Sequence, residues 1–302
     1  MNKKTQALIA VIVGNGIFGF SFLFSKLALE VTIPSVLIAV RFSVAFLVLN
    51  LIVLLGKRIK KKDGTPLVAF SLKGKPLKPV LLLALFQPVI YFIAENYGIV
   101  YTSSSFAGII IAVIPIAGVV LDILIMRTKV KPKQIICAVA SVTGVIITTI
   151  GAKDMTSSAK GLALLLVAVV AGALFYVFSK RASASYNPIE RTYVMFGVGT
   201  VVYVIIAAVQ SFGNYDKYVL PAVSAPIFWV AILYLAVVSS VVAFLLLNFG
   251  SDHVSVSQAT IFANFTTVIS IVAGIVVLGE AFTWQQGVGA AVILISVYFA
   301  AI

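Results

Sequence analysis

Charged side chains inside long apolar runs are the residues of this sequence with the clearest chemical potential. Four of them interrupt apolar runs of about 20 residues, the length of a membrane-spanning helix: Lys26, Arg41, Glu95 and Asp122. Placing a charge at the centre of a bilayer costs roughly 2.5–3.5 kcal/mol on insertion scales, so such a side chain faces a cavity or a partner. Each of the four therefore marks a binding site or a buried polar contact.

Arg41 and Glu95 are expected at similar depths in the membrane. Arg41 lies about one turn from the middle of the run 33–55, and Glu95 lies about five residues past the middle of the run 79–101, so both fall on the same side of the midplane. An Arg41–Glu95 ion pair is therefore geometrically possible, as a structural contact, as a substrate- or proton-binding pair, or as both. Lys26 is expected to snorkel to the interface, and Asp122 is expected to make a structural or interfacial contact.

A polar stripe accompanies Glu95. Gln87, Tyr91 and Glu95 recur at i, i+4 and i+8, so they share one face of a helix. Because lipid offers these groups no partner, the stripe should face other helices, either as the wall of a binding site or in interhelical hydrogen bonds. Other polar and aromatic residues in apolar runs extend this candidate site. The predicted substrate- or proton-binding residues are Glu95, Arg41, Tyr91, Gln87, Asn264, Asn15, Tyr176 and Thr267.

The composition is that of a membrane protein. The chain has 302 residues, of which 62% are hydrophobic and only 10% are charged. Its apolar runs match the ~30 Å hydrocarbon core when helical and are about twice as long as barrel strands. We predict an all-α polytopic membrane protein with ten transmembrane helices. They are expected near residues 7–29, 33–55, 79–101, 104–126, 133–150, 160–181, 188–210, 226–248, 255–278 and 284–302.

Enzyme chemistry is not indicated. The chain has a single cysteine, Cys137, and a single histidine, His253, which we place in a short loop. Zinc sites draw on several His and Cys ligands, and no phosphate-binding glycine motif followed by lysine is present. We therefore predict no catalytic residues, no metal and no cofactor, and active transport would need an ion gradient, exchange or the substrate gradient.

Positive charge is distributed asymmetrically along the chain. If the N-terminus is cytoplasmic, 17 Lys and Arg residues fall in inner segments and three fall in outer segments. Cytoplasmic loops of membrane proteins carry this excess, so we predict a plasma-membrane protein with both termini cytoplasmic and the bilayer, not nucleic acid, as the partner of its charge. The longest inner segment, 56–79, is expected to be a solvated basic loop.

The two halves of the sequence resemble each other. "FSK" at 24–26 recurs at 178–180, and "NYG" at 96–98 recurs as "NFG" at 248–250, shifts of 154 and 152 residues. Five spans per half is an odd number, so the second half enters the membrane from the opposite side. We predict two inverted five-helix repeats, residues 1–151 and 152–302, with a site between them near the midplane.

Three segments resemble the EamA branch of the drug/metabolite transporter superfamily. They are "GNGIFGFSFLFSKLALEVTIPSVLIAVRF", "ENYGIVYTSSSFAGIIIAVIPIAG" and "SQATIFANFTTVISIVAGIVVLGEAFTWQQGVGAAVILI". The resemblance covers almost the whole chain as two EamA units and implies a ten-helix carrier that moves small metabolites, most often outward. The second unit has the family's "LGE" ending at Glu280, whereas the first has Thr128 at the matching position.

The predicted function is secondary active transport of small organic metabolites, such as amino acids, or of drugs, by alternating access, with export favoured and protons as a candidate coupling ion. The alternatives are a carrier of organic or quaternary cations, which aromatic rings and a carboxylate would suit, and a lipid-linked flippase. An intramembrane enzyme is disfavoured. The small-residue helix 284–302 could pack within its own bundle or against a second copy in a homodimer.

Overall fold

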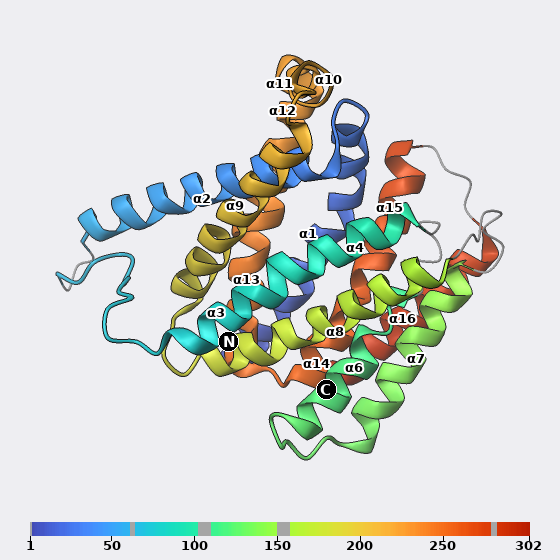
Figure 1. The fold of residues 1–302 in the computed structure, drawn as a ribbon. Helices are drawn as coiled ribbons and strands as arrows, with labels where there is room; N and C mark the ends of the chain where they lie inside the picture. The colour runs from blue at the N-terminus through green and yellow to red at the C-terminus, as the bar shows by residue number, and fades with distance from the viewer. Residues whose placement is uncertain (1, 61–63, 102–109, 150–157, 279–282) are drawn as a thin grey trace.

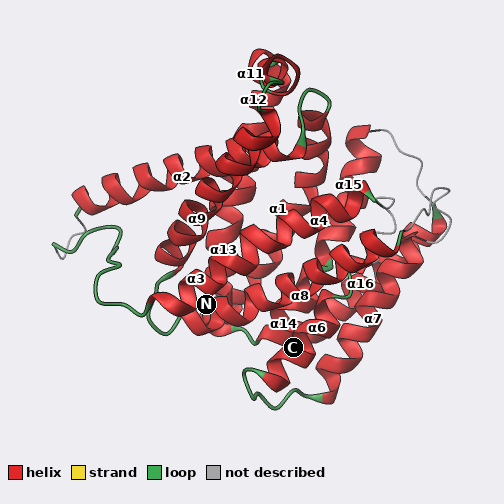
Figure 2. Cartoon of the chain, in the orientation of Figure 1, coloured by secondary structure: helices red, strands yellow, loops and turns green. Residues whose placement is uncertain are grey.

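The computed structural model describes residues 2–60, 64–101, 110–149, 158–278 and 283–302, and every regular element in this part of the chain is a helix (Figure 2). The first half contains α1 (Lys3–Leu29), α2 (Pro34–Arg58), α3 (Leu77–Ala84), the π-helix η1 (Leu85–Ile90), α4 (Tyr91–Val100), α6 (Ile114–Leu124) and α7 (Pro132–Thr149). The second half contains α8 (Ala159–Ala182), α9 (Pro188–Ser211), α10 (Tyr215–Tyr218), α11 (Leu220–Ser224), α12 (Pro226–Ile232), the π-helix η2 (Leu233–Val242), α13 (Ala243–His253), α14 (Val256–Ala263), α15 (Phe265–Leu278) and α16 (Trp284–Ala301).

Six helices in the described part of the chain are long and apolar enough to cross a membrane. Four of them, α1, α2, α8 and α9, lie where the apolar runs predict helices, and their ends follow local signals. Pro34 and Pro188 occupy the first helical positions, where a missing N–H costs nothing. Asn187 and Glu190 form a capping box at the start of α9. His253 is the last residue of α13 and not, as we expected, part of a loop.

Four of the predicted helices are interrupted rather than continuous. Gln87 has an extended backbone (φ −145°, ψ 122°) inside η1, next to Pro88, which cannot donate a helical hydrogen bond. The π-helix η2 interrupts the helix predicted at 226–248. Residues 112–113 form a turn before α6, and Asn264 separates α14 from α15. Our expectation of continuous helices was therefore wrong at these points.

The interruptions fall at matching positions of the two halves. A shift of 152 residues carries Gln87 in η1 to Ser239 in η2 and carries Ala112 to Asn264. The last two positions also touch, because Asn264 Nδ2 donates a 3.3 Å hydrogen bond to the Ala112 carbonyl oxygen. Paired breaks of this kind expose backbone groups near the middle of a bundle, where ligands of transporters bind.

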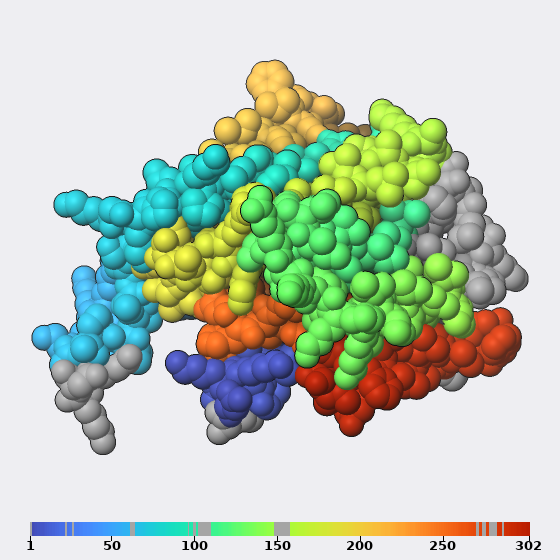
Figure 3. Space-filling view, turned by 90° about the horizontal axis from the view of Figure 1, so that it is seen from below, coloured from blue at the N-terminus to red at the C-terminus, as the bar shows by residue number. Residues whose placement is uncertain are grey.

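The helix packing follows the same correspondence. Helix α1 packs against α13 and α15, and its counterpart α8 packs against α4 and α6. Helices α2 and α9 pair with each other, and α16 packs along α7 within this chain (Figure 1). Both chain ends are marked in the lower half of Figure 1, and the view from below in Figure 3 shows the start of α1 and part of α16 on that face.

The basic segment between α2 and α3 is largely exposed, as expected of a solvated loop, and it also contacts the start of α9. Glu190 accepts hydrogen bonds from the Ser71 backbone N–H at 2.8 Å and from Lys75 Nζ at 2.5 Å. The Asn187 amide donates to the Ala69 carbonyl oxygen at 2.8 Å. Burial and nearby Glu190 raise the pKa of Tyr186 above its ordinary value, and Lys75 lies over the Tyr186 ring.

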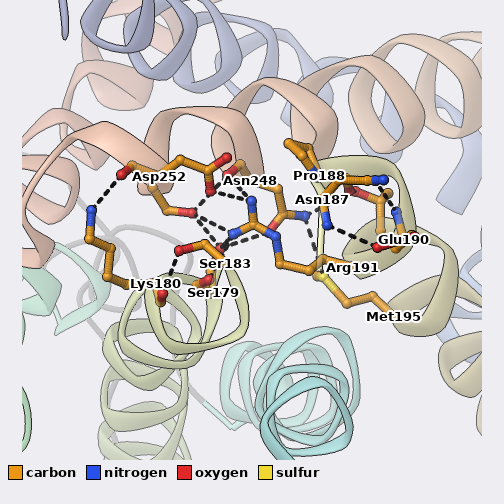
Figure 4. A network of polar contacts seen from close by, with 12 residues as sticks. Ser179, Lys180, Ser183, Asn187, Pro188, Glu190, Arg191, Met195, Asn248 and Asp252 are labelled. Atoms are coloured by element: carbon orange, nitrogen blue, oxygen red, sulfur yellow. Dashed lines mark hydrogen bonds and ion pairs between the residues drawn. The ribbon is translucent and has the colours of Figure 1, made fainter. Parts of the chain in front are cut away.

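A second polar network joins α8, α9 and α13 (Figure 4). Arg191 is fully buried and forms an ion pair with Asp252. It also donates to the carbonyl oxygens of Ser179 at 2.7 Å and Asn248 at 2.6 Å. A buried guanidinium requires such partners, because an uncompensated charge is strongly destabilising.

Gly118 allows α6 and α14 to cross closely, and its replacement tests that contact. A Cβ atom at this position would lie 2.8 Å from Thr260 Cβ, whereas a Cβ at Gly16 would meet its nearest atom at an ordinary 3.5 Å. We expect Gly118→Ala to destabilise the purified protein by about 1–3 kcal/mol through overpacking. Gly16→Ala should be tolerated. Thermal unfolding in one detergent would measure both variants, and equal midpoints would contradict the close crossing.

Candidate functional site

A central cavity of about 350 Å³ lies between the interrupted helices. Its walls come from α1, α2, the η1–α4 segment, residues 111–114, α8 and the α14–α15 break, so both halves contribute. All eight residues of the predicted binding set line it: Asn15, Arg41, Gln87, Tyr91, Glu95, Tyr176, Asn264 and Thr267. Residues far apart in sequence therefore meet at one site.

Arg41 forms the cationic wall of the cavity. Its side chain is 6% exposed, and Nε donates to Ser240 Oγ at 2.9 Å while Nη2 donates to Ser239 Oγ at 3.0 Å. Both serines lie in η2, so these bonds join the first half to the second. The guanidinium carbon lies 5.5 Å from the centre of the Phe92 ring, a cation–π distance.

Glu95 forms the anionic wall. The Tyr91 hydroxyl, one turn earlier on α4, donates a 2.8 Å hydrogen bond to Glu95 Oε1. The ion pairs formed within 4.0 Å by the described residues are Lys75–Glu190 and Arg191–Asp252, so Arg41 and Glu95 do not touch. Both side chains line the same cavity. The direct ion pair that the sequence allowed is therefore replaced by two charges facing one cavity.

Amide and phenol groups complete the lining. Asn264 is tied to the helix break, because Nδ2 also donates to Ser141 Oγ at 3.2 Å. The Asn15 amide donates to the Val11 carbonyl oxygen at 2.8 Å and lies beside the buried hydroxyl of Tyr176. These residues line the cavity and also form hydrogen bonds that hold the backbone around it. A cavity wall and structural hydrogen bonds, the two interpretations that we offered for such residues, therefore coexist at one site.

Asp122 lies outside the cavity, where it makes a structural contact as expected. It is 1% exposed, and Oδ2 accepts hydrogen bonds from the Ser257 backbone N–H at 3.0 Å and from Ser257 Oγ at 2.6 Å. This carboxylate lies at the N-terminus of α14, where the helix dipole favours negative charge. The expectations for the Lys26 side chain and for Glu280 fall outside the described residues.

Sequence reasoning missed four residues that shape the site: Ser21, Phe92, Ser239 and Ser240. Serines in apolar runs are common and carry no distinctive signal. One signal was available, because the repeat shift that starts from Gln87 leads directly to Ser239. Ser21 Oγ lies 2.6 Å from Ser239 Oγ, which extends the hydrogen-bonded chain from Arg41 to α1.

Within the described residues, no group of three or more His, Cys, Asp or Glu side chains could hold a metal ion. The cavity lining supplies charged, hydrogen-bonding and aromatic side chains. Apolar helices around a charged internal cavity are typical of a multi-pass helical membrane protein.

Comparison with known proteins identifies the family. The model of the EamA-like transporter family matches residues 5–150 and again residues 159–302. An uncharacterized transporter of Bacillus subtilis, YcxC, is 33% identical over 98% of this chain and 93% of its own length. An uncharacterized transporter of Archaeoglobus fulgidus is 25% identical over 93% of each chain. The chain therefore belongs to the EamA-like transporter family, which confirms the resemblance found in its sequence.

A solved structure supports the fold independently. A protein of known crystal structure superposes with a TM-score of 0.79, covering 98% of this chain and 96% of that protein. The two sequences are 16% identical, so this likeness concerns the arrangement of the helices alone.

Ser240→Ala tests whether the serines of η2 hold Arg41. Hydrogen bonds to charged groups contribute about 1.5–3 kcal/mol, so we expect a loss of stability of that size in thermal or denaturant unfolding. The matched control is Ser296→Ala in α16. Ser296 is also buried, but its hydroxyl bonds to the Val292 carbonyl oxygen of its own helix. Equal losses in the two variants would contradict a special role for the Arg41 contact.

Proposed function

We propose that this protein is a secondary active transporter for small zwitterionic organic solutes of the amino-acid class. Ten transmembrane helices would form two inverted repeats, residues 1–151 and 152–302, in the cell membrane with both termini cytoplasmic. The repeats would rock about the central cavity so that it opens alternately to each side, and export is the direction we favour. The family membership and the charged cavity between the halves support this proposal.

The inverted arrangement is supported by the paired interruptions and the distribution of charge. The 152-residue shift relates the breaks in both halves, and an odd number of spans per half would reverse the second repeat. The excess of Lys and Arg in alternate segments favours cytoplasmic termini.

The observation that carries the substrate class is the separation of Arg41 from Glu95. Arg41 presents a guanidinium to the cavity, and Glu95 presents a carboxylate, with no direct contact between them. A guanidinium binds carboxylates through several N–H donors in a fixed fork. Glu95 could bind an ammonium group at the same time, so one zwitterion would satisfy both charges.

A quaternary cation is the second candidate, because aromatic side chains line the same cavity. Tyr91, Phe92 and Tyr176 could surround a methylated ammonium group beside Glu95. Arg41 would then remain without an anionic partner and would repel the ligand, and this is why we prefer the zwitterion.

Transport would change the contacts that cross between the halves. Arg41 is in the first half and its serine partners are in the second, so rocking of the halves would alter these hydrogen bonds. A substrate carboxylate bound to the guanidinium would offer replacement contacts at that moment. Substrate could in this way favour the conformational change through its different affinity for the two states.

Ligand screening of purified protein tests the substrate class. We expect amino acids, but not quaternary ammonium compounds, to raise the unfolding midpoint. Arg41→Gln and Glu95→Gln should each weaken binding by about thirtyfold or more, because each leaves a desolvated charge unpaired, at a cost of at least ~2 kcal/mol. Glu30→Gln, at an exposed carboxylate at the end of α1, is the control. Stabilisation by quaternary ammonium compounds that depends on Glu95 alone would favour the second candidate.

Proton coupling can be tested at the same carboxylate. Glu95 faces the cavity and could exchange a proton as the site opens to each side. In proteoliposomes we expect an imposed pH gradient to drive uptake by the wild-type protein and by Glu30→Gln. Glu95→Gln should retain only exchange or downhill flux, because its amide cannot carry a proton. Undiminished gradient-driven uptake in Glu95→Gln would rule out this coupling role.

A further inference from the structure

A second cavity, of about 310 Å³, lies between α2, α4, α9 and α10. Helices α2 and α4 belong to the first half, and α9 and α10 belong to the second, so this cavity also lies between the halves. Phe92 lines both cavities and is the residue that they share. The second cavity lies toward the end of the bundle that carries α10.

The lining of the second cavity differs chemically from that of the central one. Its described lining residues include no Asp, Glu, Lys, Arg or His. Aromatic and aliphatic side chains dominate, and the lining includes Ser35, Phe92, Tyr97, Tyr203, Ile206 and Gln210. A charged ligand would lose its hydration here without gaining an opposite charge, whereas an uncharged aromatic ring would gain apolar and ring contacts.

The hydroxyl groups of Ser35 and Tyr203 are not open to a ligand. Ser35 Oγ has no hydrogen-bond partner among the described residues, but it is fully buried and does not reach the cavity surface. The Tyr203 hydroxyl already donates to the carbonyl oxygens of Pro88 and Val89, at 3.2 and 3.1 Å. The cavity therefore favours a ligand that it can hold by apolar and ring contacts.

Phe92 connects this cavity to the central cavity mechanically. Its ring packs edge-on against Phe42, with centroids 5.6 Å apart, and lies under the Arg41 guanidinium. A ligand in the second cavity would contact the same residue. It would also lie beside the hydrogen bond by which Gln210 of α9 donates to Tyr97 of α4, a contact between the two halves.

We propose that the second cavity is a binding site for an uncharged aromatic small molecule, and that its occupancy slows transport. The ligand would bridge α2 and α4 to α9, so it would stabilise one arrangement of the halves. A ligand that favours one of two alternating states slows the cycle between them. The inhibitory part rests on the proposed transport function, whereas the binding site does not.

Equilibrium dialysis with radiolabelled indole tests the site in the full-length purified protein. Ile206→Trp should fill the cavity and weaken saturable indole binding at least tenfold. Ile205→Trp, whose side chain is 58% exposed, is the matched control on the same helix and should bind as the wild type does. Equal saturable binding in both tryptophan variants would overturn the site, and so would indole uptake that never saturates.

Transport measurements separate this inference from the proposed function. Where the wild type transports amino acids, indole should slow their uptake in the wild type and in Ile205→Trp but not in Ile206→Trp. Uniform inhibition of all three would overturn the inhibitory role. If the wild type moves no amino acid, the proposed function fails, and the indole-binding comparison still decides whether the site exists.

Discussion

The hydrogen bonds between Arg41 and the serines of η2 are the contacts on which the central cavity depends. A guanidinium in an apolar bundle must be compensated, and here two hydroxyl groups from the other half of the chain compensate it. Because hydroxyl groups are neutral, they leave the positive charge available to the cavity. A direct pair with Glu95 would have neutralised both residues and left a site without charge.

The interrupted helices explain how those hydroxyls reach Arg41. A π-helix shifts the residues that follow it around the helix axis, and such segments are frequent at functional sites. In η2 this places Ser239 and Ser240 on the Arg41 side, and at the matching position in η1 Gln87 lines the cavity. The break at Asn264 likewise allows its amide to bind the carbonyl oxygen of Ala112. The shared frame of the two halves thus builds the cavity, while Arg41 and Glu95, each present in one half, make it chemically asymmetric.

The class of fold and the residues of the cavity wall could be predicted well from the sequence. The hydrogen bonds that these residues form could not. Long apolar runs identify helices because the hydrocarbon core requires about 20 residues, and polar residues within them had to face the interior. Periodicity therefore placed Gln87, Tyr91 and Glu95 on one wall. It could not show that Arg41 bonds to serines, since serine is compatible with apolar helices in many roles. Nor did composition distinguish a continuous helix from one interrupted at Asn264, because the hydropathy of the run is the same.

The two cavities together indicate how one scaffold could keep solute recognition and regulation apart. The central cavity is lined by Arg41 and Glu95, whereas the described lining of the second cavity is uncharged. Both touch Phe92, and the central site reaches that ring through Arg41. A ligand in the second cavity would contact Phe92, which packs against Arg41, without competing for Glu95. Such coupling needs no long pathway, because one aromatic ring is in contact with both sites.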